Sequence, residues 1–210
     1  MVRKTLFLQQ IKMMGGIVAI VGRPNVGKST FFNRMVQKRE AIVDSQSGVT
    51  RDRHYGKSDW NGREFTLIDT GGYLENSDDV FQKEIDKQVS LAVEEADAII
   101  FIVDVIDGLT GMDQNIAKLL RRASKPIYLA INKVDNASRT QMTSEFYSLG
   151  YKNFYCISSV SGSGTGELLD DLICQMPNEE KKIGDGLPNF AVVGRPNAGK
   201  SSFINAIIGK

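Results

Sequence analysis

A glycine-rich stretch near the start of the chain has the residue types and spacing of a phosphate-binding loop. Residues 22–29 read GRPNVGKS and match the pattern GxxxxGK[ST] at every fixed position. Such a loop points successive backbone N–H groups at one spot, and the helix after it adds the positive end of its dipole. Lys28 would then reach the β- and γ-phosphates, and the Ser29 hydroxyl would ligate magnesium. A strand–helix turn with no ligand is the alternative.

An acidic residue followed by glycines comes directly after the apolar segment 65–68. The sequence Asp69-Thr70-Gly71-Gly72 has the form of a Walker-B magnesium site. Thr50 lies in a polar loop between the phosphate loop and Asp69, and this position makes it the best candidate to sense the γ-phosphate through magnesium. Loops of this kind become ordered with a triphosphate and relax after hydrolysis.

A third polar motif, Asn132-Lys133-Val134-Asp135, bears on the choice of base. A carboxylate accepts hydrogen bonds from the N1–H and the 2-amino group of guanine, and adenine offers neither in that geometry. The Asn side chain can bond the base edge, and the Lys stem can cover the ring. A site that pairs buried polar groups rejects an analogue lacking them by ~10⁴ or more. A capped strand-to-helix loop is the alternative.

The stretch Ser158-Ser159-Val160 opens a glycine-rich turn. It is a candidate to donate backbone N–H groups to the carbonyl oxygen of guanine, and a turn with a helix cap is the equal alternative. His54 and Trp60 are the only residues of their kinds, and we interpret both as structural.

Strands that alternate with helices must position these motifs. Apolar β-branched runs predict buried parallel strands, and Asn61-Gly62 predicts a hairpin. We expect strands at 17–21, 55–60, 64–68, 98–103, 126–131 and 153–157, and helices at 27–36, 82–95, 112–123, 138–149 and 167–175. This alternation predicts an α/β fold of the P-loop NTPase kind, with a mostly parallel, doubly wound sheet and helices on both faces. Each motif follows a strand, at the edge where such sheets bind ligands.

The composition is that of a globular protein. The chain has 210 residues, of which 41% are hydrophobic and 24% charged, and its net charge of +1 gives no electrostatic argument for nucleic acid or a membrane. Cys156 and Cys174 have no metal-ligand spacing, and we interpret them as reduced thiols. No apolar run approaches ~18 residues, so we expect no transmembrane helix, no membrane partner and a cytoplasmic location.

The opening motif returns near the end of the chain, where residues 194–205 read GRPNAGKSSFIN. Internal repeats indicate repeated domains. We expect an arm at 1–13, a first domain at 14–176, a charged linker at 177–188 and the start of a truncated second domain at 189–210. We therefore expect a fragment of a longer protein or an incomplete gene, with residues after about 189 mobile or packed opportunistically.

Together these motifs resemble the bacterial EngA/Der family. The phosphate loop, Thr50, Asp69–Gly72, Asn132–Asp135 and the Ser158 turn are the complete GTPase motif set, and GRPNxGKS, GVTRD, DTGG and the repeat are typical of this family. The resemblance covers about residues 14–210. It implies a double-GTPase-domain protein that assists assembly of the large ribosomal subunit. In the family a second GTPase domain and a KH-like RNA-binding domain follow. Only the first turn of the former is present here, so the resemblance gives no evidence of RNA binding within this chain.

The resemblance also implies the contacts, position by position. Residues expected to bind GTP or GDP are Gly22, Arg23, Pro24, Asn25, Val26, Gly27, Lys28, Ser29, Thr30, Asp69, Thr70, Gly71, Gly72, Tyr73, Asn132, Lys133, Val134, Asp135, Ser158, Ser159 and Val160, and in the second phosphate loop Gly194, Arg195, Pro196, Asn197, Ala198, Gly199, Lys200, Ser201 and Ser202. Residues expected to serve magnesium are Ser29, Thr50 and Asp69, the last through water. Ser159 stands where many relatives carry Ala, and we expect its hydroxyl to be tolerated because the backbone is the contact.

The residue that would orient the attacking water for hydrolysis differs from that of many GTPases. Many GTPases place a Gln after the last glycine of the Asp69 motif to orient the attacking water, and here that residue is Tyr73, which cannot do the same. Relatives with Asn at the position of Asn25 are often activated by potassium, which supplies the charge of an arginine finger, worth ~10³–10⁵ in rate. We therefore hypothesise that Asn25 is a potassium ligand. Arg23, Arg51 and Arg53 are the finger candidates. The expected catalytic residues are Lys28, Thr50, Gly72 and Asn25.

The sequence therefore favours a slow, magnesium-dependent GTPase that converts GTP to GDP and phosphate, with the GTP form engaging a precursor of the large ribosomal subunit. A nucleotide-binding regulatory module with negligible turnover is the alternative, and the missing Gln is its support. An ATPase is disfavoured by Asp135.

Overall fold

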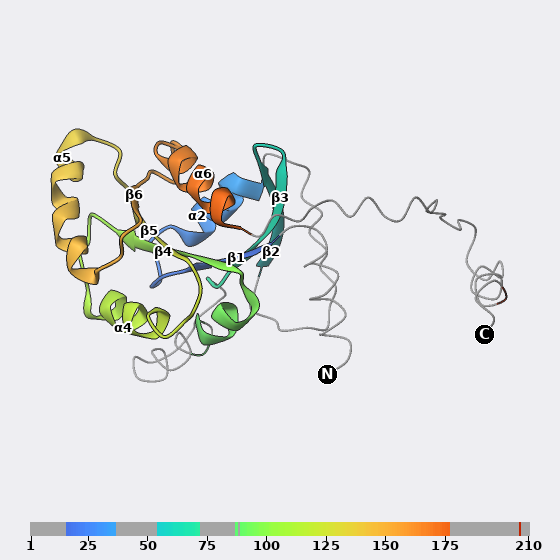
Figure 1. Ribbon diagram of the computed structural model, residues 1–210. Helices are drawn as coiled ribbons and strands as arrows, with labels where there is room; N and C mark the ends of the chain where they lie inside the picture. Colours follow the sequence, from blue (N-terminus) through green and yellow to red (C-terminus); the bar gives the residue numbers. More distant parts are fainter. Residues whose placement is uncertain (1–15, 37–53, 72–86, 88, 177–205, 207–210) are drawn as a thin grey trace. The chain divides into compact units, whose positions relative to one another are not determined.

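The computed structural model describes residues 16–36, 54–71, 87, 89–176 and 206 (Figure 1). The chain divides into a unit of Met1–Pro177 and a unit of Asn178–Lys210, and apart from residue 206 the described residues all lie in the first. The predicted arm, the linker and the second phosphate loop lie outside the described residues. The domain boundaries stay predictions.

A six-stranded sheet forms the centre of the first unit, with the strand order β2-β3-β1-β4-β5-β6. All neighbouring pairs are parallel except β2 and β3, which form an antiparallel hairpin. The strands are β1 (Ile17–Val21), β2 (His54–Trp60), β3 (Arg63–Asp69), β4 (Ala98–Asp104), β5 (Ile127–Asn132) and β6 (Phe154–Cys156). The predicted mostly parallel α/β sheet is confirmed.

The order of the strands reverses around β1, which lies between β3 and β4. In open α/β sheets, ligands bind beyond the carboxyl end of the strands at such a reversal. Every residue of β1 and β4 is buried, as expected for strands covered on both faces. The turn between β2 and β3 also forms as predicted, because Asn61 and Gly62 have φ angles of 49° and 78°, both in the left-handed region that a tight hairpin requires.

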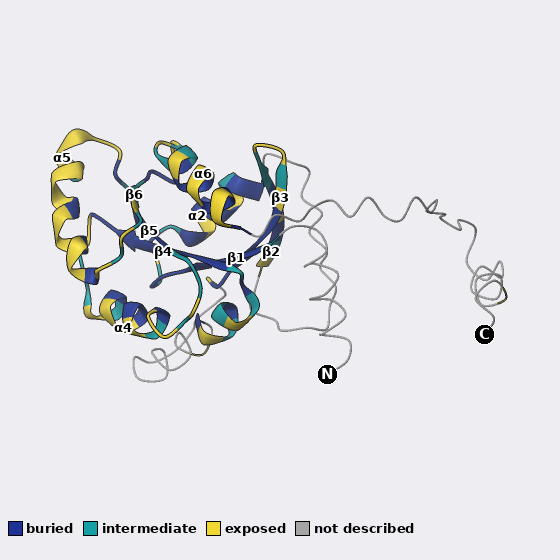
Figure 2. Ribbon diagram, viewed as in Figure 1, coloured by how far each residue is buried: buried dark blue, intermediate teal, exposed yellow. Residues whose placement is uncertain are grey.

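Helices cover both faces of the sheet (Figure 1). On one face α2 (Lys28–Val36) and α6 (Thr165–Gln175) bury Phe31, Met35, Leu168 and Leu172 against the strands. Figure 2 shows both helices with buried and exposed residues. On the other face α4 (Gly111–Leu120) and the helical residues 89–95 pack with Ile116, Leu120, Val89 and Ala92. Each fully buried Val, Leu, Ile, Phe or Met side chain contributes about 1.5–3 kcal/mol. The two apolar layers hold the sheet rigid beneath the loops at its carboxyl edge.

The expected single helix over 138–149 is wrong in type. The chain forms a short helix, α5 (Ala137–Gln141), which continues as a 3₁₀ helix, η1 (Met142–Leu149), and ends at Gly150 with φ 70°. Hydroxyl side chains explain the change. Thr143 Oγ1 donates to Thr140 O and Ser148 Oγ donates to Glu145 O, three residues earlier in each case. Such bonds compete with the regular α-helical ladder and favour the tighter turn.

Other boundaries differ from expectation by a few residues. Helix α4 ends at Leu120 rather than 123, and α6 begins at Thr165 rather than 167. Of the helix expected at 82–95, residues 87 and 89–95 are described and are helical. Cys156 and Cys174 are both free thiols, as expected. Within the described ranges, every helix is too short or too polar to cross a bilayer.

Candidate functional site

The phosphate loop between β1 and α2 depends on close backbone approach. Gly22, Asn25 and Gly27 have positive φ angles of 155°, 64° and 97°. A Cβ atom at Gly22 would lie 2.3 Å from the carbonyl oxygen of Ile102, and one at Gly27 would lie 2.3 Å from the side-chain nitrogen of Asn132. The loop can therefore curl against its neighbours only with glycine at these two positions.

The side chains with phosphate and magnesium chemistry meet at the carboxyl ends of β1 and β3. Ser29 Oγ donates to Asp69 Oδ2 at 2.8 Å, and the backbone N–H of Gly71 donates to Asp69 Oδ1 at 2.9 Å. A Cβ built at Gly71 would lie 3.3 Å from both Lys28 Cε and Ser29 Oγ. One hydroxyl and one carboxylate are the hard oxygen ligands that magnesium uses when phosphates complete its shell, so this pair fits that ion.

Lys28 is buried at the centre of the loop, with 7% of its surface exposed. Its Nζ donates to the carbonyl oxygen of Arg23 at 2.7 Å. Burial lowers the pKa of Lys28 from 10.5 to about 8, while Asp69 opposes this shift and Arg23 adds to it. A phosphate group at the loop would favour the charged amine and raise this pKa again.

Nucleotide affinity should therefore fall as the pH rises through 8. In the free protein Lys28 loses its proton near pH 8, so binding above that pH must take a proton up. We expect affinity for GDP to drop about tenfold between pH 7 and pH 9, measured by titration calorimetry. The Lys28→Arg variant stays charged throughout and corrects for titration of the nucleotide itself. A native profile parallel to that of the variant would contradict the shift.

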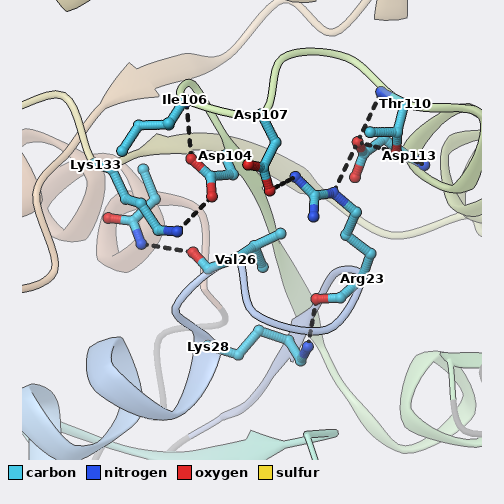
Figure 3. A network of polar contacts seen from close by, with 10 residues as sticks. Arg23, Val26, Lys28, Asp104, Ile106, Asp107, Thr110, Asp113 and Lys133 are labelled. Carbon is cyan, nitrogen blue, oxygen red and sulfur yellow. Dashed lines mark hydrogen bonds and ion pairs between the residues drawn. The ribbon is translucent and has the colours of Figure 1, made fainter.

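Arg23 does not face the phosphate site, although the sequence made it a candidate arginine finger. Its guanidinium points the other way (Figure 3), where NH2 donates to Asp107 Oδ2 at 2.9 Å and Nε donates to Asp113 Oδ2 at 3.3 Å. Arg23 is 9% exposed and Asp113 is fully buried. The side chain of Arg23 thus ties the phosphate loop to α4, and it is an anchor rather than a finger in this conformation.

Asp113 also closes the first turn of α4. Its Oδ2 accepts bonds from Thr110 N and Thr110 Oγ1, and its own N–H donates to Thr110 Oγ1, which completes a capping box. Its Oδ1 is buried and has no hydrogen-bond partner among the described residues. One carboxylate oxygen therefore carries all the side-chain contacts, and the other carries none.

This asymmetry predicts unequal effects of two substitutions. Asp113→Ala should lower the free energy of unfolding by about 2–4 kcal/mol, because it leaves Arg23 and the Thr110 N–H without their buried acceptor. Asp113→Asn keeps one oxygen for these donors and should cost about half as much. Urea denaturation measures both. Equal losses for Ala and Asn would contradict the prediction, because they would show that a neutral oxygen cannot replace the carboxylate as the acceptor for Arg23 and Thr110.

Asn132, at the end of β5, joins the phosphate loop to the loop after β6. It is 2% exposed. Its Nδ2 donates to Val26 O at 2.7 Å, and its Oδ1 accepts from both the N–H and the hydroxyl of Ser159 at 2.9 Å. The amide has a second N–H. The predicted bond from Asn132 to the base edge would have to use that remaining donor.

The next residues of this motif have charged partners. Lys133 has a φ of 66°, and its Nζ bonds the fully buried carboxylate of Asp104 at the end of β4 (Figure 3). The half-exposed carboxylate of Asp135 accepts from Arg139 NH1 through Oδ1. Arg139 NH1 also donates to Lys133 O at 3.0 Å. The conformation of residues 132–135 is thus stabilised by Asp104 of β4 and by Arg139 of α5.

Two of the three N–H groups expected to face the base have acceptors within the protein. Ser158 N donates to Ser163 O at 2.9 Å, and Ser159 N donates to Asn132 Oδ1. Within the described ranges, no acceptor pairs with the N–H of Val160, whose residue is 80% exposed. Val160 is therefore the member of the predicted set that is free to bind a ligand.

The remaining predicted residues are of three kinds. Thr70 and Val134 are bonded within the protein, since Thr70 Oγ1 donates to Ile20 O at 2.9 Å and Val134 N donates to Ile157 O at 3.0 Å, and Pro24 is half-buried. Asn25, Ser29 and Thr30 are exposed at the loop. Positions outside the described residues are Thr50, Arg51, Arg53, Gly72, Tyr73 and the second phosphate loop, Gly194–Ser202.

Sequence reasoning missed several polar residues around the site. Asp104 ends an apolar strand as Asp69 does, and Thr110-x-x-Asp113 before an apolar run is a capping-box signature, so both had a readable signal. The sequence carries no comparable signal for Arg34 and Arg139, because the carbonyl groups that they bind come close to them only in the folded chain.

The strand order, with the glycine loop after β1 and polar loops after β3, β5 and β6, defines a P-loop NTPase. The sequence matches the family described as 50S ribosome-binding GTPase over residues 17–133 and 189–210. The chain belongs to this family of 50S ribosome-binding GTPases.

Relatives and solved structures agree with this assignment. GTPase Der of Christiangramia forsetii is 68% identical over 197 residues, which are 94% of this chain and 45% of that protein. GTPase Der of Flavobacterium johnsoniae is 65% identical over 200 residues, 94% of this chain and 46% of that protein. The predicted resemblance to the EngA/Der family is thus confirmed, and the chain spans about half the length of the curated relatives it matches.

The fold is similar to that of Era. A variant of Era from Aquifex aeolicus, bound to GDP and AlF4−, aligns with a TM-score of 0.62 and 28% identity over 84% of this chain and 59% of that one. Era in complex with MgGDPNP and a segment of 16S ribosomal RNA aligns with a TM-score of 0.60 and 27% identity, over 85% of this chain and 60% of that one.

Proposed function

We propose that this chain binds GTP with magnesium and hydrolyses it to GDP and phosphate. The observation that carries the proposal is the meeting of Lys28, Ser29 and Asp69 at the carboxyl ends of β1 and β3. Lys28 would pair with the β- and γ-phosphates, and Ser29 and Asp69 would hold magnesium. Magnesium would supply positive charge that neutralises the negative charge developing on the phosphates. Asp135 would select guanine, with its carboxylate already oriented by Arg139.

The test is phosphate release from GTP, with ATP as a parallel substrate and a blank without protein. We expect slow turnover of GTP, little of ATP, and none by the Lys28→Met variant purified in the same way. Lys28→Met distinguishes turnover by this site from a contaminating enzyme. Release equal to the blank would reject hydrolysis and leave the alternative of a regulatory module that binds nucleotide without turnover. Equal rates with GTP and ATP would reject the guanine assignment.

We propose further that Asn25 supplies an oxygen ligand to a potassium ion that assists hydrolysis. Asn25 is exposed at the phosphate loop and has a φ of 64°. Hydrolysis should be several-fold faster in potassium chloride than in sodium chloride at equal ionic strength. Asn25→Gly should abolish this difference, because glycine adopts the same backbone conformation without the amide. Asn61→Gly is a matched control at the hairpin, where φ is 49°. Full stimulation in Asn25→Gly would reject the proposal.

We also propose that the GTP-bound form engages a precursor of the large ribosomal subunit. Its support is the name of the family, 50S ribosome-binding GTPase. Sedimentation with precursor particles should carry the chain in the presence of a non-hydrolysable GTP analogue and less of it with GDP. Absence of the chain from the particles in both states would reject the proposal for this chain.

A further inference from the structure

We propose that Arg34 is a positioning residue for guanine recognition, because it fixes the peptide group that presents the Val160 N–H to the base. This inference rests on the proposed function, since it assigns a role in guanine binding at the loop after β6. Arg34 lies in the last turn of α2, on the helix that begins at the phosphate loop. Arg34 is not part of any of the GTPase sequence motifs, and its side chain contacts the loop after β6.

Arg34 donates hydrogen bonds to two consecutive carbonyl oxygens in the loop after β6, those of Ser159 and Val160. Its Nε donates to Ser159 O at 2.6 Å, and its NH2 donates to Val160 O. The guanidinium is a rigid planar fork, so two bonds from one side chain set the direction of both carbonyl groups. A Cβ built at Gly162, where φ is 87°, would lie 2.7 Å from Arg34 NH1, which shows how closely the loop wraps this side chain.

The geometry of the peptide bond carries this constraint to the ligand side. Ser159 C=O and Val160 N–H belong to one planar peptide group, and the described residues contain no cis peptide bond. In a trans peptide the two groups point in opposite directions. Because Arg34 holds the oxygen toward α2, the N–H of Val160 is directed away from α2. Two neighbouring N–H groups, of Ser158 and Ser159, are already bonded within the protein. Arg34 therefore orients the one donor of the three that remains for the carbonyl oxygen of guanine.

The experiment compares GDP with 2-aminopurine riboside diphosphate, which lacks that carbonyl oxygen and the N1–H but keeps the sugar, the phosphates and the 2-amino group. The native preference for GDP therefore contains both losses, whereas an effect of Arg34 that is specific to GDP reports on the carbonyl oxygen. Affinities are measured by calorimetry for the native chain, Arg34→Met, Arg34→Lys and Arg122→Met. Arg122 is exposed just beyond α4 and is the matched control. We expect Arg34→Met to weaken GDP roughly tenfold and the analogue less than twofold, and Arg34→Lys to fall between native and Met for GDP alone. Arg122→Met should change neither.

The outcomes separate this inference from the function on which it rests. If the native chain binds the analogue as well as GDP, recognition of the carbonyl oxygen fails, and the role of Arg34 fails with it. If the native chain prefers GDP and Arg34→Met keeps the same preference, only the role of Arg34 is overturned. An equal loss for both ligands would mean that Arg34 supports the fold in general, and that result also overturns the proposal. Arg34→Lys keeps the charge and stem, so it supplies the same comparison if Arg34→Met does not fold.

Discussion

Replacing Asp135 by Asn should lower the affinity for GDP by ~10³-fold or more and raise the affinity for xanthosine diphosphate (XDP). In the proposed site the carboxylate would accept two hydrogen bonds, from the N1–H and the 2-amino group of guanine. An amide offers one acceptor and one donor, and its donor would face the 2-amino group. Xanthine has an oxygen at that position, so the amide pairs with it correctly. Competition against a fluorescent nucleotide measures both affinities.

The same substitution should leave the fold nearly unchanged, which separates recognition from stability. Asp135 is half-exposed and precedes the N-cap of α5, and exposed ion pairs such as the one it makes with Arg139 contribute about 0.2–1 kcal/mol. Thermal unfolding should therefore shift little. Glu167→Gln removes another exposed carboxylate, on α6, and should alter neither property. Unchanged preference for GDP in Asp135→Asn would reject the assignment of this residue to the base.

The second large effect is expected at Asn132. Asn132→Ala removes the acceptor of the Ser159 N–H and the donor to Val26 O, all within a buried region. Unsatisfied groups of this kind cost 1–3 kcal/mol each, so the free energy of unfolding should fall by about 2–4 kcal/mol. Affinity for GDP should fall as well, because the phosphate loop and the loop after β6 lose their common tie. Chemical denaturation and calorimetry measure the two effects.

Asn132→Asp tests whether the Nδ2 bond to Val26 or the Oδ1 bonds to Ser159 contribute more to stability. Aspartate keeps an acceptor for Ser159 but turns an oxygen toward Val26 O, which cannot donate a hydrogen bond. We expect the contact with the phosphate loop to be lost and the contact with Ser159 to survive. If Asp were as stable as Asn, the bond between Asn132 and Val26 would be unimportant.

Much of the fold was predictable because local chemistry and tertiary structure agree. The apolar run Ile17–Val21 is a strand buried on both faces, and Asn61-Gly62 forms the tight turn that its backbone preferences favour. The 3₁₀ stretch Met142–Leu149 was not predictable from apolar spacing, because hydroxyl groups bonded three residues back decide its type.

The site was predictable to the level of motifs and not of partners. The positions of Lys28, Ser29 and Asp69 follow from strand ends that meet at one edge of the sheet. Arg23 lies in the phosphate loop, yet its side chain binds acids from a segment 84 and 90 residues away. Arg34 bonds a loop 125 residues away. Pairings at such separation depend on how the helices pack on the sheet, and residue spacing along the chain does not predict them.

The contact between Gly27 and Asn132 has an evolutionary consequence. A Cβ at residue 27 would lie 2.3 Å from the side-chain nitrogen of Asn132, so no larger residue can enter at 27 while Asn132 keeps its place. A smaller residue at 132 would relieve that clash, but it would first give up the bond to Val26. Each substitution alone should lower the stability of the protein, and the two losses should not be additive because the residues are in contact. Residue 27 also has a φ of 97°, which any residue other than glycine adopts only with strain. We therefore expect both positions to stay unchanged between lineages, so that the phosphate loop and the motif after β5 are inherited as one unit.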